Sequence, residues 1–221
     1  MNIAFIPVRG GSKSIPLKNI KILNAKPLVW WTAKAANDAG CIDKVIIATD
    51  SAEIKDVVLS FNLPKLEVYD RDPKNASDTA STESVMIEYL EKSDLKDEDL
   101  FFLIQATSPM LKTEHIEGMY ETFLKDGADS MFTGVREYHF HWIPSTTKPL
   151  YDYRNRPRRQ DFEGLIAENG ACYINSVGNI KRDKCRLSGK IAAYELPSYT
   201  AYEIDEEVDW IIVETLMKEL K

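Results

Sequence analysis

Short apolar runs alternate along the chain with longer segments in which apolar residues recur at helical spacing. The apolar runs predict strands at residues 2–6, 44–50, 65–70, 100–109 and 128–135. The periodic segments predict amphipathic helices at residues 26–40, 51–61, 79–92 and 112–127. Apolar strands separated by helices are typical of parallel strands covered on both faces. The pattern therefore predicts an α/β fold with a mainly parallel sheet.

The alternation stops at about residue 138 and returns near residue 169. Residues 138–165 are rich in aromatic and basic side chains and show no helical period, so we interpret them as an excursion from a single domain of residues 1–221. Strands are predicted again at residues 169–175 and 190–197. A last helix is predicted from about Asp205, and we expect its buried face to consist of Val208, Ile211, Ile212, Leu216 and Leu220.

The distribution of charge adds more to this picture than the composition does. The chain of 221 residues has a net charge of −7, which argues against nucleic acid as a partner. Residues 1–37 contain six basic side chains and no acidic one, so the remaining residues carry a net charge of −13. A bound anion is the simplest physical reason for such a segment in an acidic protein.

Cysteine content and hydropathy exclude several classes of protein. Cys41, Cys172 and Cys185 form no CxxC pair, which argues against a disulfide framework and a structural zinc site. No apolar run is long enough to span a bilayer, and the apolar stretch near the N-terminus is too short for a signal peptide. We therefore expect a cytoplasmic protein with no membrane partner.

Ligands of open α/β sheets bind beyond the carboxyl ends of the strands. The first such segment here, "RGGSKSIPLKN" at residues 9–19, combines glycines with arginine and lysine. Glycines let a backbone approach a ligand closely, and the basic side chains neutralise phosphate oxygens. The segment lacks the spacing of a Walker A motif and of the Rossmann fingerprint. Composition alone leaves two readings open, a phosphate-binding loop and an ordinary basic turn.

The stretch "IPVRGGSKSIPLKN" resembles the first signature of the CMP-sialic acid synthetases, also called acylneuraminate cytidylyltransferases. Further stretches fit this family in the same order along nearly the whole chain: "KPL", "ATDS", "RDPKNASDTAS", "QATSP", "RRQD", "NGACYIN" and "EIDEEVDW". The resemblance implies a Rossmann-like nucleotidyltransferase fold with a small dimerisation extension. It also implies that CTP and a nine-carbon α-keto acid sugar are joined, with Mg²⁺, to give a CMP-sugar and pyrophosphate.

The resemblance assigns CTP binding to two segments. In the opening loop, residues 9–19, it places the triphosphate on Arg9, Gly10, Gly11, Ser12 and Lys13, the reacting phosphate on Lys18 and the ribose near Asn19. In the second segment it places cytosine or its ribose on Arg71, Ala80 and Thr82. The implied catalytic residues are Arg9, Lys13, Lys18 and Asp205. Charge patterning alone leaves the lysines as a solvated loop face, and Ser77 or Asp78 as a simple helix cap.

Two carboxylates near the C-terminus form a candidate metal site. Glu203 and Asp205 are two residues apart, so they share one face of an extended segment, and such oxygen ligands suit Mg²⁺ beside phosphates. Family members usually have Asp-x-Asp here, so the resemblance implies that Asp205 is the main ligand and that the longer Glu203 assists it. The alternative is that Asp205 caps the last helix.

The resemblance also assigns the sugar site. Its implied residues are Gln105, Ser108, Asn169, Gly170, Tyr173 and Arg186, together with Arg159, whose family counterpart reaches into the partner subunit's active site. At two places the sequence departs from the family pattern, and these departures leave open which sugar is used: Neu5Ac, Kdn, legionaminic acid or pseudaminic acid. Arg186 and Leu187 stand where Neu5Ac-using bacterial members have paired aromatics, and no lysine precedes Lys148 in the excursion.

Other interpretations stay open at this point. A related nucleotidyltransferase for Kdo would share a glycine-rich basic loop, and a non-catalytic nucleotide-binding or scaffold protein would share the fold. The opening lysines and terminal carboxylates argue against the scaffold. His139 and His141 flank Phe140, and we interpret them as part of a dimer arm or pocket rim rather than a metal site. An exposed aromatic patch in residues 138–165 indicates a homodimer.

Overall fold

The computed structural model describes residues 1–12, 14–77 and 79–220. Within these residues, seven strands form one sheet in the order β11-β7-β10-β6-β1-β4-β5. They are β1 (Asn2–Pro7), β4 (Lys44–Thr49), β5 (Leu66–Asp70), β6 (Leu100–Ile104), β7 (Ser130–Glu137), β10 (Leu165–Ser176) and β11 (Ile191–Leu196). Neighbouring strands are parallel, except that β10 is antiparallel to both β6 and β7. The prediction of a mainly parallel α/β sheet is confirmed.

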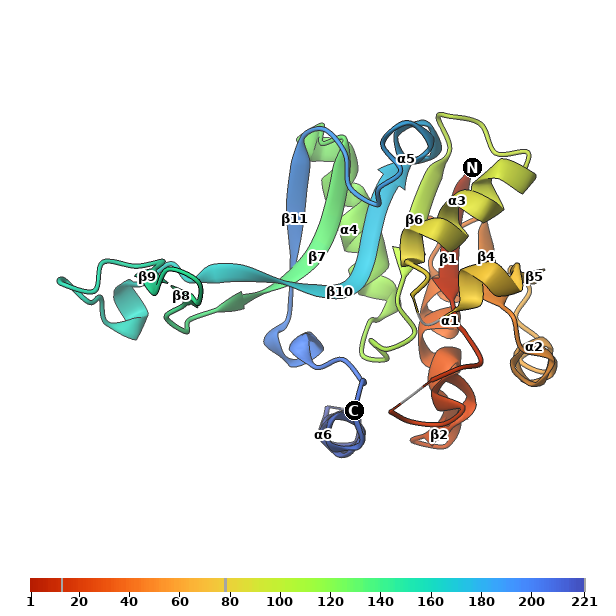
Figure 1. Ribbon diagram of the computed structural model, residues 1–221, viewed down its shortest axis with the longest axis horizontal. Helices are drawn as coiled ribbons and strands as arrows, with labels where there is room; N and C mark the ends of the chain where they lie inside the picture. The colour runs from red at the N-terminus through yellow and green to blue at the C-terminus, as the bar shows by residue number, and fades with distance from the viewer. Residues whose placement is uncertain (13, 78, 221) are drawn as a thin grey trace.

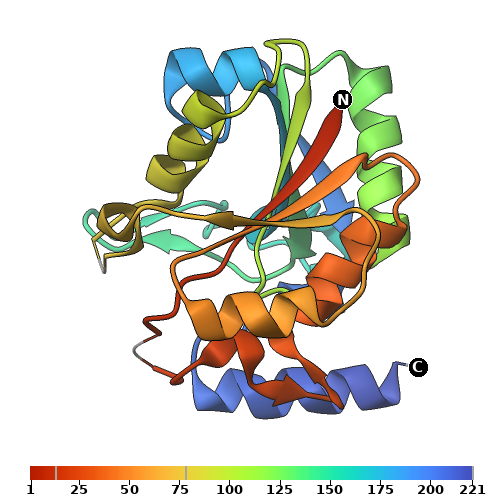
Figure 2. The ribbon, with the colours of Figure 1, turned by 90° about the vertical axis from the view of Figure 1, so that its right-hand side faces the viewer.

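Helices cover both faces of the sheet (Figures 1 and 2). One face packs against α1 (Leu28–Asp38), α2 (Ala52–Leu59) and α4 (Thr113–Asp126), and the other against α3 (Thr82–Lys92) and α5 (Val177–Asp183). The side chains of β1 alternate between these two cores: Ile6 joins the first and Phe5 the second. Burial on both faces explains why the strands read as continuous apolar runs.

Helix starts depend on local capping. The hydroxyl of Ser51 accepts a hydrogen bond from the Ile54 N–H at 3.3 Å, and Ser81 caps α3 through the Ser84 N–H at 3.1 Å. The helix predicted from residue 79 therefore begins at Thr82, and Ser77 does not cap it. Asp78, the other predicted cap, lies outside the described residues.

Two short elements depart from the predicted pattern. The helix predicted from residue 26 begins at Leu28, because β3 (Lys26–Pro27) pairs with β2 (Ile22–Leu23) as a small antiparallel ladder. Helix α5 was not predicted, since its buried apolar residues, Val177 and Ile180, are too few to establish a helical period.

The C-terminal helix α6 (Glu207–Glu219) crosses the lower end of the molecule beneath the opening loop (Figure 2). The predicted buried face was right for Leu216, which packs against a buried cluster, and wrong for Val208 and Ile211, which are 56% and 67% exposed. Trp210 and Val213 are buried instead, in a cluster that includes Ile204 of the preceding segment. The large apolar area of Trp210 sets the rotation of the helix.

The helix cap also corrects one alternative from the sequence. Glu206 is the N-cap residue of α6, and it forms a capping box with Asp209, whose carboxylate accepts the Glu206 N–H at 2.8 Å. Asp205 precedes the cap, so its carboxylate is not used for capping.

The excursion, residues 138–165 and hereafter the arm, projects from the sheet on extensions of β7 and β10 (Figure 1). It contains β8 (Trp142–Ile143), β9 (Lys148–Pro149) and the 3₁₀ turn η3 (Arg159–Asp161). Phe140 stacks on Tyr151 with ring centroids 4.3 Å apart, while Trp142 and Tyr153 remain exposed. Among the described residues, no helix combines the length and apolar character of a membrane span.

Candidate active site

The carboxyl ends of the parallel strands β1 and β6 lie next to the N-terminal half of the antiparallel β10, at one end of the sheet. A cavity of about 240 Å³ opens there and is lined by Pro7, Arg9, Arg71, Ala80, Ser81, Thr82, Val85 and Gln105. The structure thus brings together predicted CTP residues from two distant segments, Arg9 from the first and Arg71, Ala80 and Thr82 from the second. Gln105, which was predicted for the sugar, shares the same cavity.

A buried carboxylate on α3 shapes the second of these segments. Glu88 accepts hydrogen bonds from the Tyr69 hydroxyl at 2.6 Å, the Asp72 N–H at 2.9 Å and the Asn75 amide at 2.6 Å. Burial would raise the pKa of Glu88, but these bonds and the Lys92 ammonium outweigh burial and lower the pKa to about 2. Glu88 therefore fixes the path of η2 (Pro73–Ala76) while its charge stays fully compensated.

Arg71 lines the cavity with a guanidinium that is only partly satisfied. The residue is 8% exposed, and its Nη2 donates to the Asn75 carbonyl. Within the described part of the chain, its Nε is buried without a hydrogen-bond partner, and burial lowers the pKa of the guanidinium. Leaving a buried N–H unpaired is costly, so this position favours a ligand that carries an acceptor oxygen.

The described part of the opening loop is anchored to its neighbours. The Gly10 N–H donates to Asp50 Oδ1 at 3.0 Å, and a Cβ at Gly10 would lie 3.0 Å from the Ser51 Cβ. Asn19 is buried and donates from its side-chain amide to the Arg9 carbonyl at 3.1 Å, so this amide holds the loop. A Cβ at Gly11 would meet nothing within 4 Å. The predicted role of Lys13 lies outside the described residues.

Lys18, in η1 (Lys18–Ile20), connects the opening loop to the C-terminal segment. Its Nζ donates to the Ile204 carbonyl at 2.8 Å and to Asp205 Oδ1 at 3.0 Å, and its side chain is 12% exposed. The Ile204 N–H donates in turn to the Thr107 carbonyl at 2.8 Å, just beyond β6. The predicted catalytic residues Lys18 and Asp205 are therefore in direct contact.

The Glu203 carboxylate lies against the backbone of Gly170. Gly170 has a φ of +66°, which favours glycine, and a Cβ there would lie 3.0 Å from Glu203 Oε1 and press on that carboxylate. Burial, followed by the charge of Asp205, raises the pKa of Glu203 to about 7, against an opposing effect of Lys18. Glu203 is therefore poorly compensated among the described side chains.

A metal ion would fit these carboxylates only with help from a ligand. Within residues 1–12, 14–77 and 79–220, no three His, Cys, Asp or Glu side chains gather into a metal-binding group. Mg²⁺ is often held by one or two carboxylates, with substrate phosphates and water completing its shell. Glu203 and Asp205 fit that arrangement, since a cation would compensate Glu203.

Asn169 is buried and supports the site rather than lining the cavity. Its side-chain oxygen accepts a hydrogen bond from the Thr133 hydroxyl at 2.8 Å, and its amide donates to the Thr200 carbonyl at 3.2 Å in η4 (Ser198–Ala201). These bonds hold β10 where its pairing with β7 shifts register, next to Gly170. Ser108 is also buried, and its hydroxyl lacks a partner among the described residues.

Tyr173 and Arg186, both predicted for the sugar, contact each other. The Arg186 guanidinium lies 5.0 Å from the centroid of the Tyr173 ring, and the Tyr173 hydroxyl donates to Glu168. Arg186 Nε donates to Glu83 Oε1 at 2.6 Å, which joins this contact to the start of α3. Glu168, Glu83 and Glu88 escaped the sequence analysis, because acidic residues in surface helices and strands carry no distinguishing pattern.

Arg159 lies in the arm, outside the cavity. Its guanidinium is 5.6 Å from the Tyr138 ring centroid, and it lines a separate hollow formed by arm residues and Arg136. Within one chain, the structure does not bring Arg159 to Arg9 or Lys18. His141 Nε2 lies 3.2 Å from Glu137 Oε2, and neither predicted histidine belongs to a metal-binding group among the described residues.

Comparison with known proteins identifies the family to which the chain belongs. A model of the cytidylyltransferase family matches residues 3–162. The chain is 38% identical over 219 residues to N-acylneuraminate cytidylyltransferase of Oncorhynchus mykiss, covering 96% of this chain and 49% of that protein. It is 29% identical over 232 residues to CMP-N,N'-diacetyllegionaminic acid synthase of Legionella pneumophila, covering 98% and 96%.

Solved structures agree on the fold. A CMP:2-keto-3-deoxy-manno-octonic acid synthetase complexed with CTP superposes with a TM-score of 0.72 at 16% identity, covering 100% of this chain and 99% of that one. The 4-diphosphocytidyl-2C-methyl-D-erythritol synthase of Anaerococcus prevotii gives 0.73 at 14% identity, covering 98% and 96%. The predicted nucleotidyltransferase fold is confirmed.

The chain belongs to the cytidylyltransferase family. The more specific resemblance to the CMP-sialic acid synthetases, predicted from the ordered motifs, is confirmed by the named relatives. The chain spans about half the length of the curated relatives from fish that it matches.

The protonation of Glu203 leads to a prediction about stability. The carboxyl has its ordinary pKa of about 4.5 in the unfolded chain, and burial raises the pKa to about 7 in the folded protein. The folded state therefore binds more protons between these values, and stability falls as pH rises through them. In buffer with EDTA, Glu203→Gln should match the wild type near pH 4.5 and exceed it by about 2 kcal/mol near pH 8, after allowance for partial exposure.

Urea unfolding across this pH range measures the difference. Glu121→Gln is the matched control, because it makes the same substitution at an exposed position of α4, on another element than the carboxylate pair. A difference between Glu203→Gln and wild type that does not widen from about pH 5 to pH 8 would contradict the burial argument.

Proposed function

We propose that the protein is a cytidylyltransferase that joins CTP to a nonulosonic acid, giving a CMP-sugar and pyrophosphate. The observation that carries the proposal is the cavity that Arg71 lines together with Arg9 and the start of α3, where the buried Nε of Arg71 has no partner among the described residues. A pyrimidine nucleotide offers acceptor oxygens on its base and negative charge on its phosphates, and this lining suits both. The family match and the named relatives support the same reaction.

In the proposed reaction, the anomeric hydroxyl of the sugar attacks the α-phosphorus of CTP. The new bond forms between that oxygen and the α-phosphorus, and the hydroxyl proton passes to solvent. The bond from the α-phosphorus to the oxygen that bridges it to the β-phosphate breaks, and pyrophosphate leaves with that oxygen. Negative charge grows on the phosphoryl and leaving oxygens, so catalysis consists mainly of positioning and charge stabilisation. Arg9, the loop glycines and Ser12 would hold the triphosphate, and the resemblance assigns the same role to Lys13.

Lys18 is the residue that we place on the reacting phosphate. Its ammonium is held at the sheet edge by Ile204 and Asp205, so it is oriented before a nucleotide arrives. Pre-oriented charge stabilises a transition state without reorganisation at the moment of reaction. Glu203 and Asp205 would hold Mg²⁺, which when bound would neutralise charge on the departing pyrophosphate.

The sugar would occupy the side of the cavity near Gln105 and Gly170. Ser108 and Tyr173 would flank the sugar, and Asn169 would shape its site through the irregularity in β10. Relatives are named for N-acylneuraminate and for N,N'-diacetyllegionaminic acid, so both kinds of nonulosonic acid are candidates. Kdn, pseudaminic acid and the eight-carbon Kdo complete the set to be tested.

We also propose that the protein works as a homodimer. Trp142 and Tyr153 of the arm are exposed aromatic side chains, as expected for a surface that a second copy covers. Arg159 on the same arm would then act in the partner subunit's site.

The activity is tested by pyrophosphate release with CTP and Mg²⁺ against Neu5Ac, Kdn, N,N'-diacetyllegionaminic acid, pseudaminic acid and Kdo. We expect turnover with a nine-carbon acid and none without Mg²⁺. Turnover with Kdo alone would replace the proposal by the related eight-carbon reaction. Failure to bind CTP at all would refute the nucleotide site.

Lys18→Met should lower kcat by roughly a hundredfold or more, which is typical for the loss of one pre-oriented charge at a transition state. Lys34→Met on α1 is the control, because it also removes a lysine charge, but one that pairs with Asp38 on its own helix. Steady-state rates with saturating CTP measure the effect. Equal kcat values for the two variants would remove Lys18 from the catalytic role.

Arg159→Ala should lower activity while the variant remains a dimer, because the arginine is expected to act across subunits and the aromatic side chains are expected to cover the interface. Light scattering gives the oligomeric state, and pyrophosphate release gives the rate. Full activity in the variant would refute its role in the site. A monomeric wild type would refute the dimer itself.

A further inference from the structure

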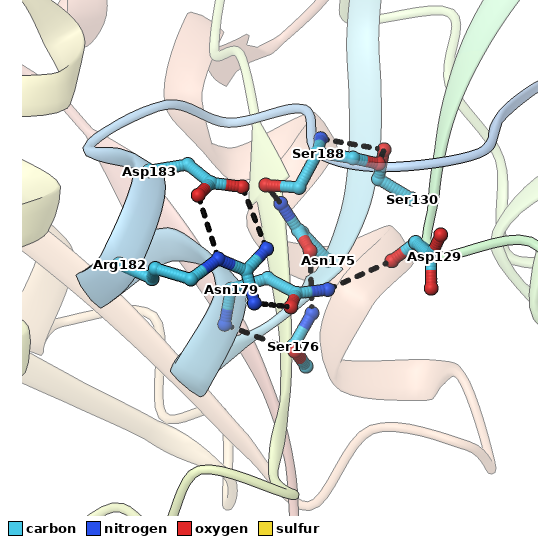
Figure 3. Close-up of polar contacts among 8 residues, drawn as sticks. All are labelled: Asp129, Ser130, Asn175, Ser176, Asn179, Arg182, Asp183 and Ser188. Atoms are coloured by element: carbon cyan, nitrogen blue, oxygen red, sulfur yellow. Dashed lines mark hydrogen bonds and ion pairs between the residues drawn. The ribbon is translucent and has the colours of Figure 1, made fainter.

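The loop of residues 184–190, which carries Arg186, is fixed by a polar cluster at its base (Figure 3). The Ser188 N–H donates to the Ser130 hydroxyl at 2.9 Å, and the Ser130 hydroxyl donates to the Ser188 carbonyl at 2.8 Å. The Asn175 amide donates to Ser188 Oγ at 3.0 Å and to the Arg186 carbonyl at 3.1 Å. These bonds tie the backbone of the loop to β10 at Arg186 and to β7 at Ser188.

The Arg186 side chain reaches from this fixed backbone to the first turn of α3. Its Nε is 2.6 Å from Glu83 Oε1, and the two side chains are only 20% and 24% exposed. Burial would raise the pKa of Glu83, but the hydrogen bond from Arg186 outweighs burial and lowers it. The pair is thus a partly desolvated ion pair between a fixed loop and a helix start, and it spans 103 residues of sequence.

That helix start forms one wall of the nucleotide cavity. Ala80, Ser81, Thr82 and Val85 line the cavity, and Glu83 lies between them without lining it. The Arg186 guanidinium also lies over the ring of Tyr173, which is buried in the core cluster that includes Val85 and Met86 of α3. Arg186 therefore contacts the element that shapes the nucleotide wall, and its Nε is engaged before any sugar binds.

We propose that Arg186 is a positioning residue for the nucleotide, acting through Glu83, rather than a sugar-binding residue. The ion pair holds the first turn of α3 against the loop of residues 184–190, and so fixes where Thr82 and its neighbours meet a bound nucleotide. This inference rests on the proposed function, because it assumes that the cavity binds CTP.

The test is calorimetric titration of CTP into wild type, Glu83→Gln, Arg186→Met and the double variant, without sugar. The sign of the effect of Glu83→Gln is decisive. Simple electrostatics predicts tighter binding when a negative charge is removed near an anionic ligand, whereas loss of positioning predicts weaker binding. We expect each single variant to raise the Kd for CTP about fivefold and the double variant to be no weaker than the weaker single, as for two residues acting as one pair.

Arg182→Met is the matched control. Arg182 has the same charge and lies near the same loop, but its hydrogen bonds go to Asp183 and Asn179 (Figure 3). Its Kd for CTP should stay within about twofold of wild type.

The possible results distinguish failure of the positioning role of Arg186 from failure of the proposed cytidylyltransferase function. An unchanged or lower Kd for CTP in Glu83→Gln overturns the inference, and so does a double variant whose loss equals the product of the two single losses. A fall in melting temperature with an unchanged Kd also overturns it, since the pair would then be structural only. A wild type that does not bind CTP removes the proposed function and the inference with it.

Discussion

The site depends on the contact between Lys18 and the C-terminal segment. A largely buried ammonium must be compensated, and here the Ile204 carbonyl and the Asp205 carboxylate compensate it. The same Ile204 residue bonds the loop after β6 through Thr107 and packs on Trp210 of α6. One buried residue thus joins the opening loop, the sheet edge and the last helix, and the candidate catalytic groups are held together as a consequence.

Charged side chains of both signs gather at this end of the sheet, and some of them are better paired than others. Glu88 is fully hydrogen-bonded and has a low pKa, so it serves as a structural charge. Glu203 has a raised pKa, and Arg71 keeps a buried N–H without a partner in the described residues. A ligand that carries acceptor oxygens and brings a cation would stabilise both of these groups. A metal–nucleotide complex has this combination of charges.

Residues that do not line the cavity still determine its shape. Glu88 fixes the path that leads from Arg71, and Asn169 fixes the irregularity of β10 beside Gly170. Asn175 fixes the backbone of Arg186. Each of these polar side chains is buried and satisfied, which makes its geometry well defined. The wall of the cavity is therefore set by hydrogen bonds formed one layer behind it.

The sequence by itself determined the mainly parallel α/β sheet, because apolar periodicity is a local pattern. The ordered motifs added the resemblance to the cytidylyltransferases, and with it the nucleotidyltransferase fold and the two segments expected to bind CTP. The rotation of α6 could not be predicted that way, since it depends on where Trp210 finds a distant apolar partner. Glu83, Glu88 and Glu168 likewise look like ordinary surface acids until folding places them beside Arg186, Asn75 and Tyr173. Only the tertiary structure decided which charges meet, because the partners of each charge come from segments far apart in the chain.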